Sequence, residues 1–309
     1  MIRQSGLKGF KIDGIEERVI VSLFADDTLV YLHENDKLEE LTKILDTFCE
    51  ASTAKFNLNK TEYLPIGSPL HRDRVKTTGL LNKDQEIPVP KDTIKGDASP
   101  MRTLGCWVGY NIDITEKWKK IENNQEATIA IWDQINPSLY ARPMVIKGVV
   151  ESQGHFLTRV NTCPPHIAKR MNYRARTFLW RGKKRGHMPF EEIIAPRSIG
   201  GLDFPDMEAR AEAMILQKFQ NFAAPASKRP RWAWVYDQLI NKSIPEKPKV
   251  DPESRISWLL QNWHESTTKA AKLPYYILKM LRVARKWNVG LRPLKLTTEV
   301  KEEMPIWHH

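Results

Sequence analysis

The stretch FADDTLVYL, residues 24–32, decides how the first third of the chain folds. A largely apolar run over residues 19–24 leads into its two aspartates, and a second apolar run over residues 29–32 follows them. Two such runs separated by a short polar segment are typical of antiparallel strands and the turn that joins them. The sequence therefore predicts a buried β-hairpin with its turn at residues 25–28.

The two adjacent carboxylates of Asp26 and Asp27 are the most informative side chains in this stretch. Neighbouring carboxylates between apolar strands repel each other and are poorly solvated, which is costly. A divalent cation such as Mg²⁺ prefers carboxylate oxygens and would remove that cost. The alternative is a solvent-exposed hairpin tip, where aspartate is common because it forms local hydrogen bonds. The residues alone leave both interpretations open.

Outward from the hairpin, the pattern predicts a small α+β region. Asn35 and Asp36 are good N-caps for a helix that places Leu38, Leu41, Leu45 and Phe48 on one face. Residues 55–65 indicate a loop and a short strand. Residues 66–101 are rich in proline, glycine, aspartate and lysine and predict a long, mobile connection. Residues 104–110 are the last strand candidate.

The rest of the chain has helical periodicity. We expect helices over residues 114–139, from Pro143 to about Arg159, from the Pro164-Pro165 pair to about Trp180, and over residues 206–223. A proline- and lysine-containing stretch at 242–252 separates two further helical segments, in which tryptophans pack helices together. The prediction is an α+β chain with three regions, 1–110, 111–224 and 225–309.

The positive charge of the chain is concentrated in one segment. The formal net charge is +11, and residues 141–190 alone hold 11 Lys+Arg against a single acidic residue. A concentrated basic segment favours a polyanion partner, most simply nucleic acid, over charge that serves solubility alone.

Within this segment, cations are interleaved with the aromatic residues Tyr173, Phe178 and Trp180. Lysine and arginine attract phosphates, and aromatic rings can stack on exposed bases. The alternative is that Phe178 and Trp180 belong to the core and the cations form its solvated face. The predicted nucleic-acid-binding residues are Arg159, Lys169, Arg170, Arg174, Arg176, Arg181, Lys183, Lys184 and Arg185.

Several classes of protein are disfavoured. No apolar run approaches the roughly 20 residues of a membrane span, so no membrane partner is expected. The first residues lack the apolar core of a secretory signal. Cys49, Cys106 and Cys163 lie far apart, which disfavours disulfides and a structural zinc site and favours an intracellular, reducing compartment. The cations at 183–185 form a weak nuclear-import signal, and the localisation is otherwise open.

The order of motifs resembles the palm of reverse transcriptases from LINE-type (non-LTR) retrotransposons. FADDTLVYL is followed by an amphipathic helix and by STAKFNLNKTE, residues 52–62. Further along, FLWRGK (178–183) and GGLDFPD (200–206) are similar to signatures that often follow such enzymes. The resemblance covers about residues 6–223, and the motifs occur in the family's order at plausible spacing.

The resemblance implies roles for individual residues. In that family the hairpin aspartates bind the catalytic Mg²⁺, which implies this role for Asp26 and Asp27. A lysine of the next motif lies near the incoming nucleotide, which implies this role for Lys60. Leu104-Gly105 matches the strand that opens the primer grip. Thr53 departs from the family, which usually has glycine there. The family performs RNA-templated DNA synthesis, and its thumb region contacts RNA and DNA in the template-primer.

The resemblance also implies what this chain lacks. Two-metal phosphoryl transfer needs carboxylates from two separate strands, and in the family the other aspartate lies well upstream of the hairpin, as do the fingers. We therefore expect an N-terminally truncated remnant that is inactive alone, with the upstream half on a separate chain if it exists. The alternatives are a catalytically silent nucleic-acid-binding protein and a helical interaction scaffold.

Overall fold

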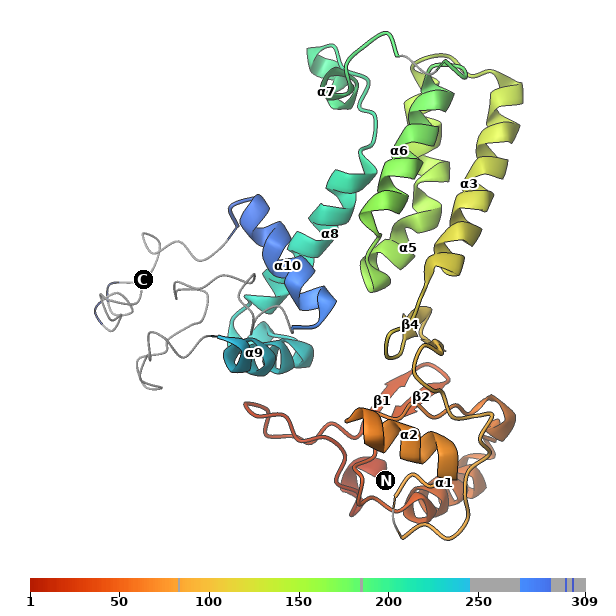
Figure 1. Cartoon of the computed structure of the whole chain (residues 1–309), viewed down its shortest axis with the longest axis vertical. Helices are drawn as coiled ribbons and strands as arrows, with labels where there is room; N and C mark the ends of the chain where they lie inside the picture. Colours follow the sequence, from red (N-terminus) through yellow and green to blue (C-terminus); the bar gives the residue numbers. More distant parts are fainter. Residues whose placement is uncertain (83, 184–185, 245–272, 290–297, 299–301, 303–309) are drawn as a thin grey trace. The chain divides into compact units, whose positions relative to one another are not determined.

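The structure, a computed structural model, describes residues 1–82, 84–183, 186–244, 273–289, 298 and 302 of the chain. The chain divides into two compact units, Met1–Lys119 and Lys120–His309, which are described separately (Figure 1). The described residues form α-helices and two small antiparallel sheets. The predicted α+β class is confirmed, and helices predominate.

The hairpin at the two aspartates is present in the first unit. Strands β1 (Val21–Phe24) and β2 (Asp27–Val30) pair antiparallel, and Phe24 lies opposite Asp27 at the last pair. The prediction that the hairpin is buried is wrong, because the side chains of Leu23 and Phe24 are 62% and 67% exposed. The hairpin packs through its base, and the buried residues there are Leu7, Ile20, Val21 and Leu41.

Helix α1 (Leu38–Ser52) follows the hairpin as predicted, but its N-cap differs from the prediction. Lys37 occupies the cap position without a capping side-chain hydrogen bond. The carboxylate of Asp36 is buried and accepts hydrogen bonds from the backbone N–H groups of Lys8 at 2.7 Å, Gly9 at 2.9 Å and His33 at 2.8 Å. Asp36 therefore joins the N-terminal segment to the entry of α1 instead of capping the helix.

The predicted mobile connection at 66–101 contains regular structure. Helix α2 (Pro69–Thr78) begins after Ser68, whose hydroxyl accepts a hydrogen bond from the His71 N–H at 3.2 Å. The buried side chain of Val75 then packs into a small core cluster that also contains Val89 and Ile94. The prediction of a mobile connection is wrong. The polar composition of this segment gave little weight to the Ser68 cap and to the buried cluster of Val75, Val89 and Ile94.

A second hairpin lies near the end of the first unit. Strands β3 (Met101–Thr103) and β4 (Cys106–Val108) pair antiparallel. The expected strand over 104–110 is shorter, because Leu104 and Gly105 form the two-residue turn with φ of 47° and 77°. Two consecutive positive φ angles suit the tight turn of a β-hairpin, and glycine accepts such an angle without strain.

The second unit is helical, and Figure 1 shows α3, α5 and α6 running alongside one another. The predicted helix after Pro143 is interrupted, because the five residues before Glu151 form a π-helical turn. The amide side chain of Gln125 donates a hydrogen bond at 2.9 Å to the carbonyl of Val150 in this turn. The bounds of these elements are α3 Thr115–Ile135, α4 Ala141–Val145, the π-helix Ile146–Val150, α5 Ser152–Asn161 and α6 Pro165–Leu179.

Helices α8, α9 and α10 share an apolar core. Helices α8 and α10 pack against each other (Figure 1), and α9 joins them through Ala233 and Ile240. Trp232 packs against this core as predicted, whereas Trp258 and Trp263 lie outside the described residues. No helix in the described parts of the chain is both long and apolar enough to cross a membrane. The bounds are α7 Phe190–Ile194, α8 Met207–Phe222, α9 Arg231–Ser243 and α10 Tyr275–Lys286.

We predict that Asp36→Asn lowers the free energy of unfolding by about 2–4 kcal/mol, because the amide loses charge-assisted hydrogen bonds to three backbone donors. Urea denaturation measures this loss. Asp46→Asn, at an exposed position of α1, is the matched control and should change stability by less than about 0.5 kcal/mol. Equal effects of the two substitutions would contradict the role assigned to Asp36.

Candidate functional site

The predicted aspartate pair lies at the exposed tip of the first hairpin. Asp26 is in the turn, beside Ala25 with its positive φ of 52°, and Asp27 begins β2. Both aspartates are exposed, and neither carboxylate accepts a hydrogen bond or forms an ion pair with any described residue. Of the two interpretations of the pair, the geometry matches the solvent-exposed hairpin tip.

The aspartate pair does not form a complete metal site by itself. Mg²⁺ prefers octahedral coordination by oxygen, and two adjacent carboxylates supply part of that shell. Among the described residues, no group of three or more histidines, cysteines and acidic residues is placed to hold a metal ion. The residues present therefore do not fit a two-metal centre, although they leave two carboxylates accessible.

Lys60, the third predicted site residue, lies in a short 3₁₀ turn, Leu58–Lys60, and is exposed. It forms no ion pair with Asp26 or Asp27. Upstream, Thr53 ends α1 with a left-handed φ of 58°. A left-handed residue at this place is usually glycine, and a β-branched residue adopts it at a cost. The helix end therefore has the backbone that glycine favours, although threonine occupies it.

The basic helix α6 has two faces with different surroundings. Phe178 and Trp180 are 3% and 7% exposed, so these two aromatic residues belong to the core and do not offer rings to bases. Tyr173 is 57% exposed and shares its face with Lys169, four residues earlier. The core alternative is thus the correct one for Phe178 and Trp180, and one aromatic ring remains on the surface.

Two of the predicted nucleic-acid-binding residues are bound to a buried glutamate of α3. Glu122 accepts hydrogen bonds from Arg170 Nε at 2.9 Å, Arg170 Nη2 at 2.7 Å and Arg174 Nη1 at 2.7 Å. Its side chain is 5% exposed. The Arg170 guanidinium and, less strongly, that of Arg174 hold the pKa of Glu122 below its usual range, against the effect of burial. Arg170 and Arg174 thereby join α6 to α3.

The other predicted cations differ in whether their side chains contact other residues. Arg159 donates a hydrogen bond to Gln217, and Arg176 lies over the ring of Phe190, 5.2 Å from its centre. Three cations are exposed and form no ion pair with the described residues: Lys169, Arg181 and Lys183. Lys184 and Arg185 lie outside the described residues.

The turn after α6 positions two of these exposed cations. Arg181 and Gly182 have positive φ angles of 53° and 79°, which end the helix abruptly. The neighbouring Arg142 is 1% exposed, and its guanidinium donates to the carbonyl of Phe178 and lies 4.6 Å from that residue's ring centre. Arg142 thus fixes the last turn of α6, a role that the sequence did not predict.

A second buried glutamate lies directly after the π-helical turn. Glu151 is 4% exposed, and its Oε1 lies 2.5 Å from Arg210 Nε and 3.5 Å from His155 Nε2. Burial raises the pKa of Glu151, and the charges of Arg210 and His155 act in the opposite direction. A glutamate four residues before a histidine has the spacing of a surface helix pair, so this buried cluster could not be predicted from the spacing.

The GGLDFPD segment has an identifiable structural function. Gly201 is buried so closely that a Cβ there would lie 2.0 Å from the carbonyl oxygen of Ala195. Asp206 caps α8 by accepting from the Glu208 N–H at 2.9 Å, and Asn172 of α6 donates to the same oxygen at 2.9 Å. The segment therefore fixes the start of α8 against α6.

The buried cysteine Cys163 is not activated as a nucleophile. Cys163 is 6% exposed, and burial raises the pKa of its thiol to about 12. A thiol with that pKa stays protonated at neutral pH and is a poor nucleophile.

No protein-family model matches the chain. The chain is 25% identical over 139 residues to a protein of Xenopus laevis described as "Transposon TX1 uncharacterized 149 kDa protein". This match takes in 41% of the chain and 11% of that protein, so the chain spans a small part of the curated relative's length. The finding relates part of the chain to a transposon protein whose name states no activity.

We predict that Glu122→Gln lowers the free energy of unfolding at pH 7 by about 2 kcal/mol, since it removes the charge that holds two partly exposed arginines. Because the folded-state pKa of Glu122 is lowered, its contribution is complete above the unfolded pKa and is lost as the pH falls through the folded value. The difference between wild type and variant should therefore shrink from about pH 5 downward.

Thermal and urea denaturation across this pH range would measure the effect. The matched control is Glu126→Gln on the same helix, because Glu126 is 51% exposed and pairs with Arg174 alone at 2.7 Å. Its effect should stay below about 0.5 kcal/mol. A pH-independent loss in Glu122→Gln would contradict the charge-based account.

Proposed function

We propose that the chain is a retrotransposon-derived remnant of an RNA-directed DNA polymerase, a reverse transcriptase of the non-LTR type. The observation that carries the proposal is the sequence FADD in a tight hairpin that presents Asp26 and Asp27, followed by a Leu104-Gly105 hairpin and a basic helical unit. The similarity to a transposon protein supports a transposon origin. The order of the aspartate hairpin and the Leu104-Gly105 segment is the one that the reverse-transcriptase resemblance implies, although Leu104 and Gly105 form a turn and not the expected strand.

In this proposal the second unit binds RNA and DNA through phosphate contacts. Lys169, Arg181 and Lys183 are exposed cations without an ion-pair partner among the described residues, and Tyr173 adds an exposed aromatic ring beside Lys169. Such contacts supply affinity but carry little sequence information. The expected partner is a template-primer bound through its backbone.

The proposal also holds that the chain does not polymerise DNA by itself. Two-metal phosphoryl transfer requires ions about 4 Å apart, held by carboxylates from separate elements. One hairpin tip with two adjacent carboxylates does not provide that arrangement, and no third acidic ligand is placed beside it in the described residues. Mg²⁺ therefore belongs to the proposal as the cofactor of a completed site, formed with an upstream half of the polymerase.

A catalytically silent nucleic-acid-binding protein is the second candidate. The observation that favours it is that Glu122, Arg170 and Arg174 join α3 to α6 entirely within the second unit, which contains no residue of the aspartate hairpin. The two candidates predict the same binding and differ in whether the aspartates act in a larger assembly.

We predict that the isolated chain extends no primer on poly(rA)/oligo(dT) with Mg²⁺ or Mn²⁺, because its carboxylates cannot fix two ions in line with a primer end. Asp26→Ala should behave as the wild type does in this assay. Product formation that disappears in Asp26→Ala would overturn the proposal of inactivity.

We predict that binding to an RNA–DNA hybrid weakens steeply with salt. Each neutralised phosphate adds about 0.9 to the magnitude of the log–log slope on duplex DNA, so four or five contacts give a slope of about −4. Replacing Lys169, Arg181 and Lys183 by glutamine should weaken binding on all sequences alike and reduce the slope by about 2 to 3. Fluorescence anisotropy at several salt concentrations measures both quantities.

The matched control replaces three exposed lysines of the first unit, Lys43, Lys55 and Lys91, by glutamine, which changes the net charge equally. This control should leave the slope almost unchanged. Equal losses in both triple variants would mean that net charge alone governs binding, and an absence of any salt dependence would support the scaffold alternative.

A further inference from the structure

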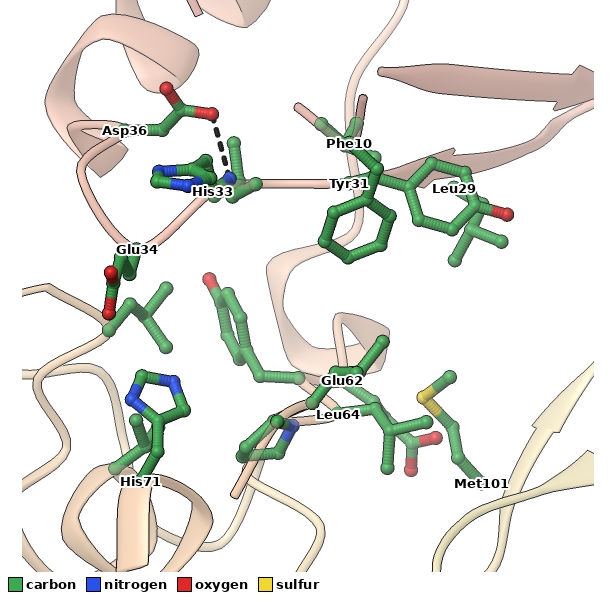
Figure 2. Close-up of a pocket in the computed structure, with 18 of the residues that line it drawn as sticks. Phe10, Leu29, Tyr31, His33, Glu34, Asp36, Glu62, Leu64, His71 and Met101 are labelled. Atoms are coloured by element: carbon green, nitrogen blue, oxygen red, sulfur yellow. Dashed lines mark hydrogen bonds between the residues drawn. The ribbon is translucent and has the colours of Figure 1, made fainter. Parts of the chain in front are cut away.

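The first unit contains a pocket with a volume of about 740 Å³, within the size range of small-molecule sites. Its walls come from the segment after β2, the segment 62–68, helix α2 and the β3–β4 hairpin. Figure 2 shows Phe10 and Tyr31 toward one end of the pocket and Glu34 and His71 toward the other. All of these residues belong to the first unit, so the pocket does not depend on how the two units are arranged.

The formal charges that line the pocket are all acidic. Its lining includes three carboxylates, Glu34, Asp36 and Glu62, and includes no lysine or arginine. Lys95 Nζ lies 2.6 Å from Glu62 Oε1 and forms an ion pair with it, and the carboxylate of Asp36 accepts hydrogen bonds from three backbone N–H groups. Glu34 is exposed and forms no ion pair with any described residue. The charge left for a ligand to meet is therefore negative.

The opposite end of the pocket offers aromatic surface. The ring centres of Phe10 and Tyr31 are 5.5 Å apart with a tilt of 49°, and Tyr63 also lines the cavity. Burial raises the pKa of both Tyr31 and Tyr63, so both phenols remain neutral at physiological pH. Aromatic faces attract cations and pack against flat apolar groups.

These features disfavour the more familiar ligands of a polymerase-like chain. Lysine and arginine are the usual side-chain partners of a nucleotide's phosphates, and the lining contains neither. A metal ion needs several ligands at short distance, and the described residues contain no such group of three. A ligand with an apolar body and one positive charge matches both ends of the pocket: its body fits the aromatic end and its charge fits the end with Glu34.

We propose that this pocket binds a small aryl-alkyl ammonium compound, with its aromatic body against Phe10 and Tyr31 and its ammonium group at Glu34. The site is separate from the hairpin aspartates and from the basic helical unit. The proposal does not rest on the polymerase origin of the chain, and either can fail without the other.

The test uses the full chain and three probes of one shape: 3-phenylpropylamine, which is an ammonium ion at pH 7, the neutral 3-phenylpropan-1-ol and the anionic 3-phenylpropionate. Isothermal titration calorimetry should rank the ammonium at least about fivefold tighter than the alcohol, and the carboxylate weakest. Amide NMR shifts caused by the ammonium should gather at Phe10 and in residues 29–36, 62–71 and 101–108, which line the pocket. Equal affinities for all three probes, or shifts outside these segments, would overturn the proposal.

Two variants separate the charge from the apolar body. Glu34→Gln should weaken the ammonium about three- to tenfold and leave the alcohol unchanged, whereas Glu39→Gln, an exposed glutamate outside the lining, should change neither. Ile66→Ser, at a 48% exposed lining position, should weaken both ligands, and Ile87→Ser, 77% exposed and outside the lining, should weaken neither. All four positions are partly or fully exposed, so the folded chain should tolerate these changes. An unchanged ammonium affinity in Glu34→Gln would refute the charge recognition.

Discussion

The buried carboxylate of Glu122 is the constraint on which the second unit depends. It receives three hydrogen bonds from Arg170 and Arg174, and a carboxylate with 5% exposure would be costly without them. The pair therefore sets how α6 lies on α3. The same ion pairs reduce the positive charge that α6 can offer to a ligand, because Arg170 and Arg174 are paired with Glu122. The charge available to a polyanion lies at Lys169 and in the turn that follows α6.

Two other buried carboxylates also join separate segments of the chain. Asp36 holds three backbone donors in the first unit, and Glu151 joins α5 to α8 through Arg210. Asp26 and Asp27 differ from these residues because they are exposed and hold no part of the described structure together. Asp36, Glu122 and Glu151 thus stabilise the fold, whereas Asp26 and Asp27 remain accessible to a ligand.

The periodic parts of the fold could be predicted from the sequence, and the contacts between distant segments could not. The spacing of apolar residues predicts α3, and the fixed φ of proline predicts that α6 begins at the Pro164-Pro165 pair. Helix α2 could not be predicted, because its polar composition is typical of a loop and Val75 is its one buried residue. Glu122 has no local signal at all, because its partners lie about fifty residues away and a lone glutamate in a helix predicts a surface position.

The exposure of the aspartate hairpin is itself informative about what a working site would require. A sheet of two strands covers its apolar side chains poorly, and Leu23 and Phe24 are exposed beside the carboxylates. Among the described residues no third strand lies along either edge of this sheet. Under the proposed function, a further strand would pair with an edge of this hairpin and bring the second metal-binding carboxylate, while the packing of that larger sheet would cover Leu23 and Phe24. The proposal thus links the covering of the exposed apolar side chains to the completion of the metal site.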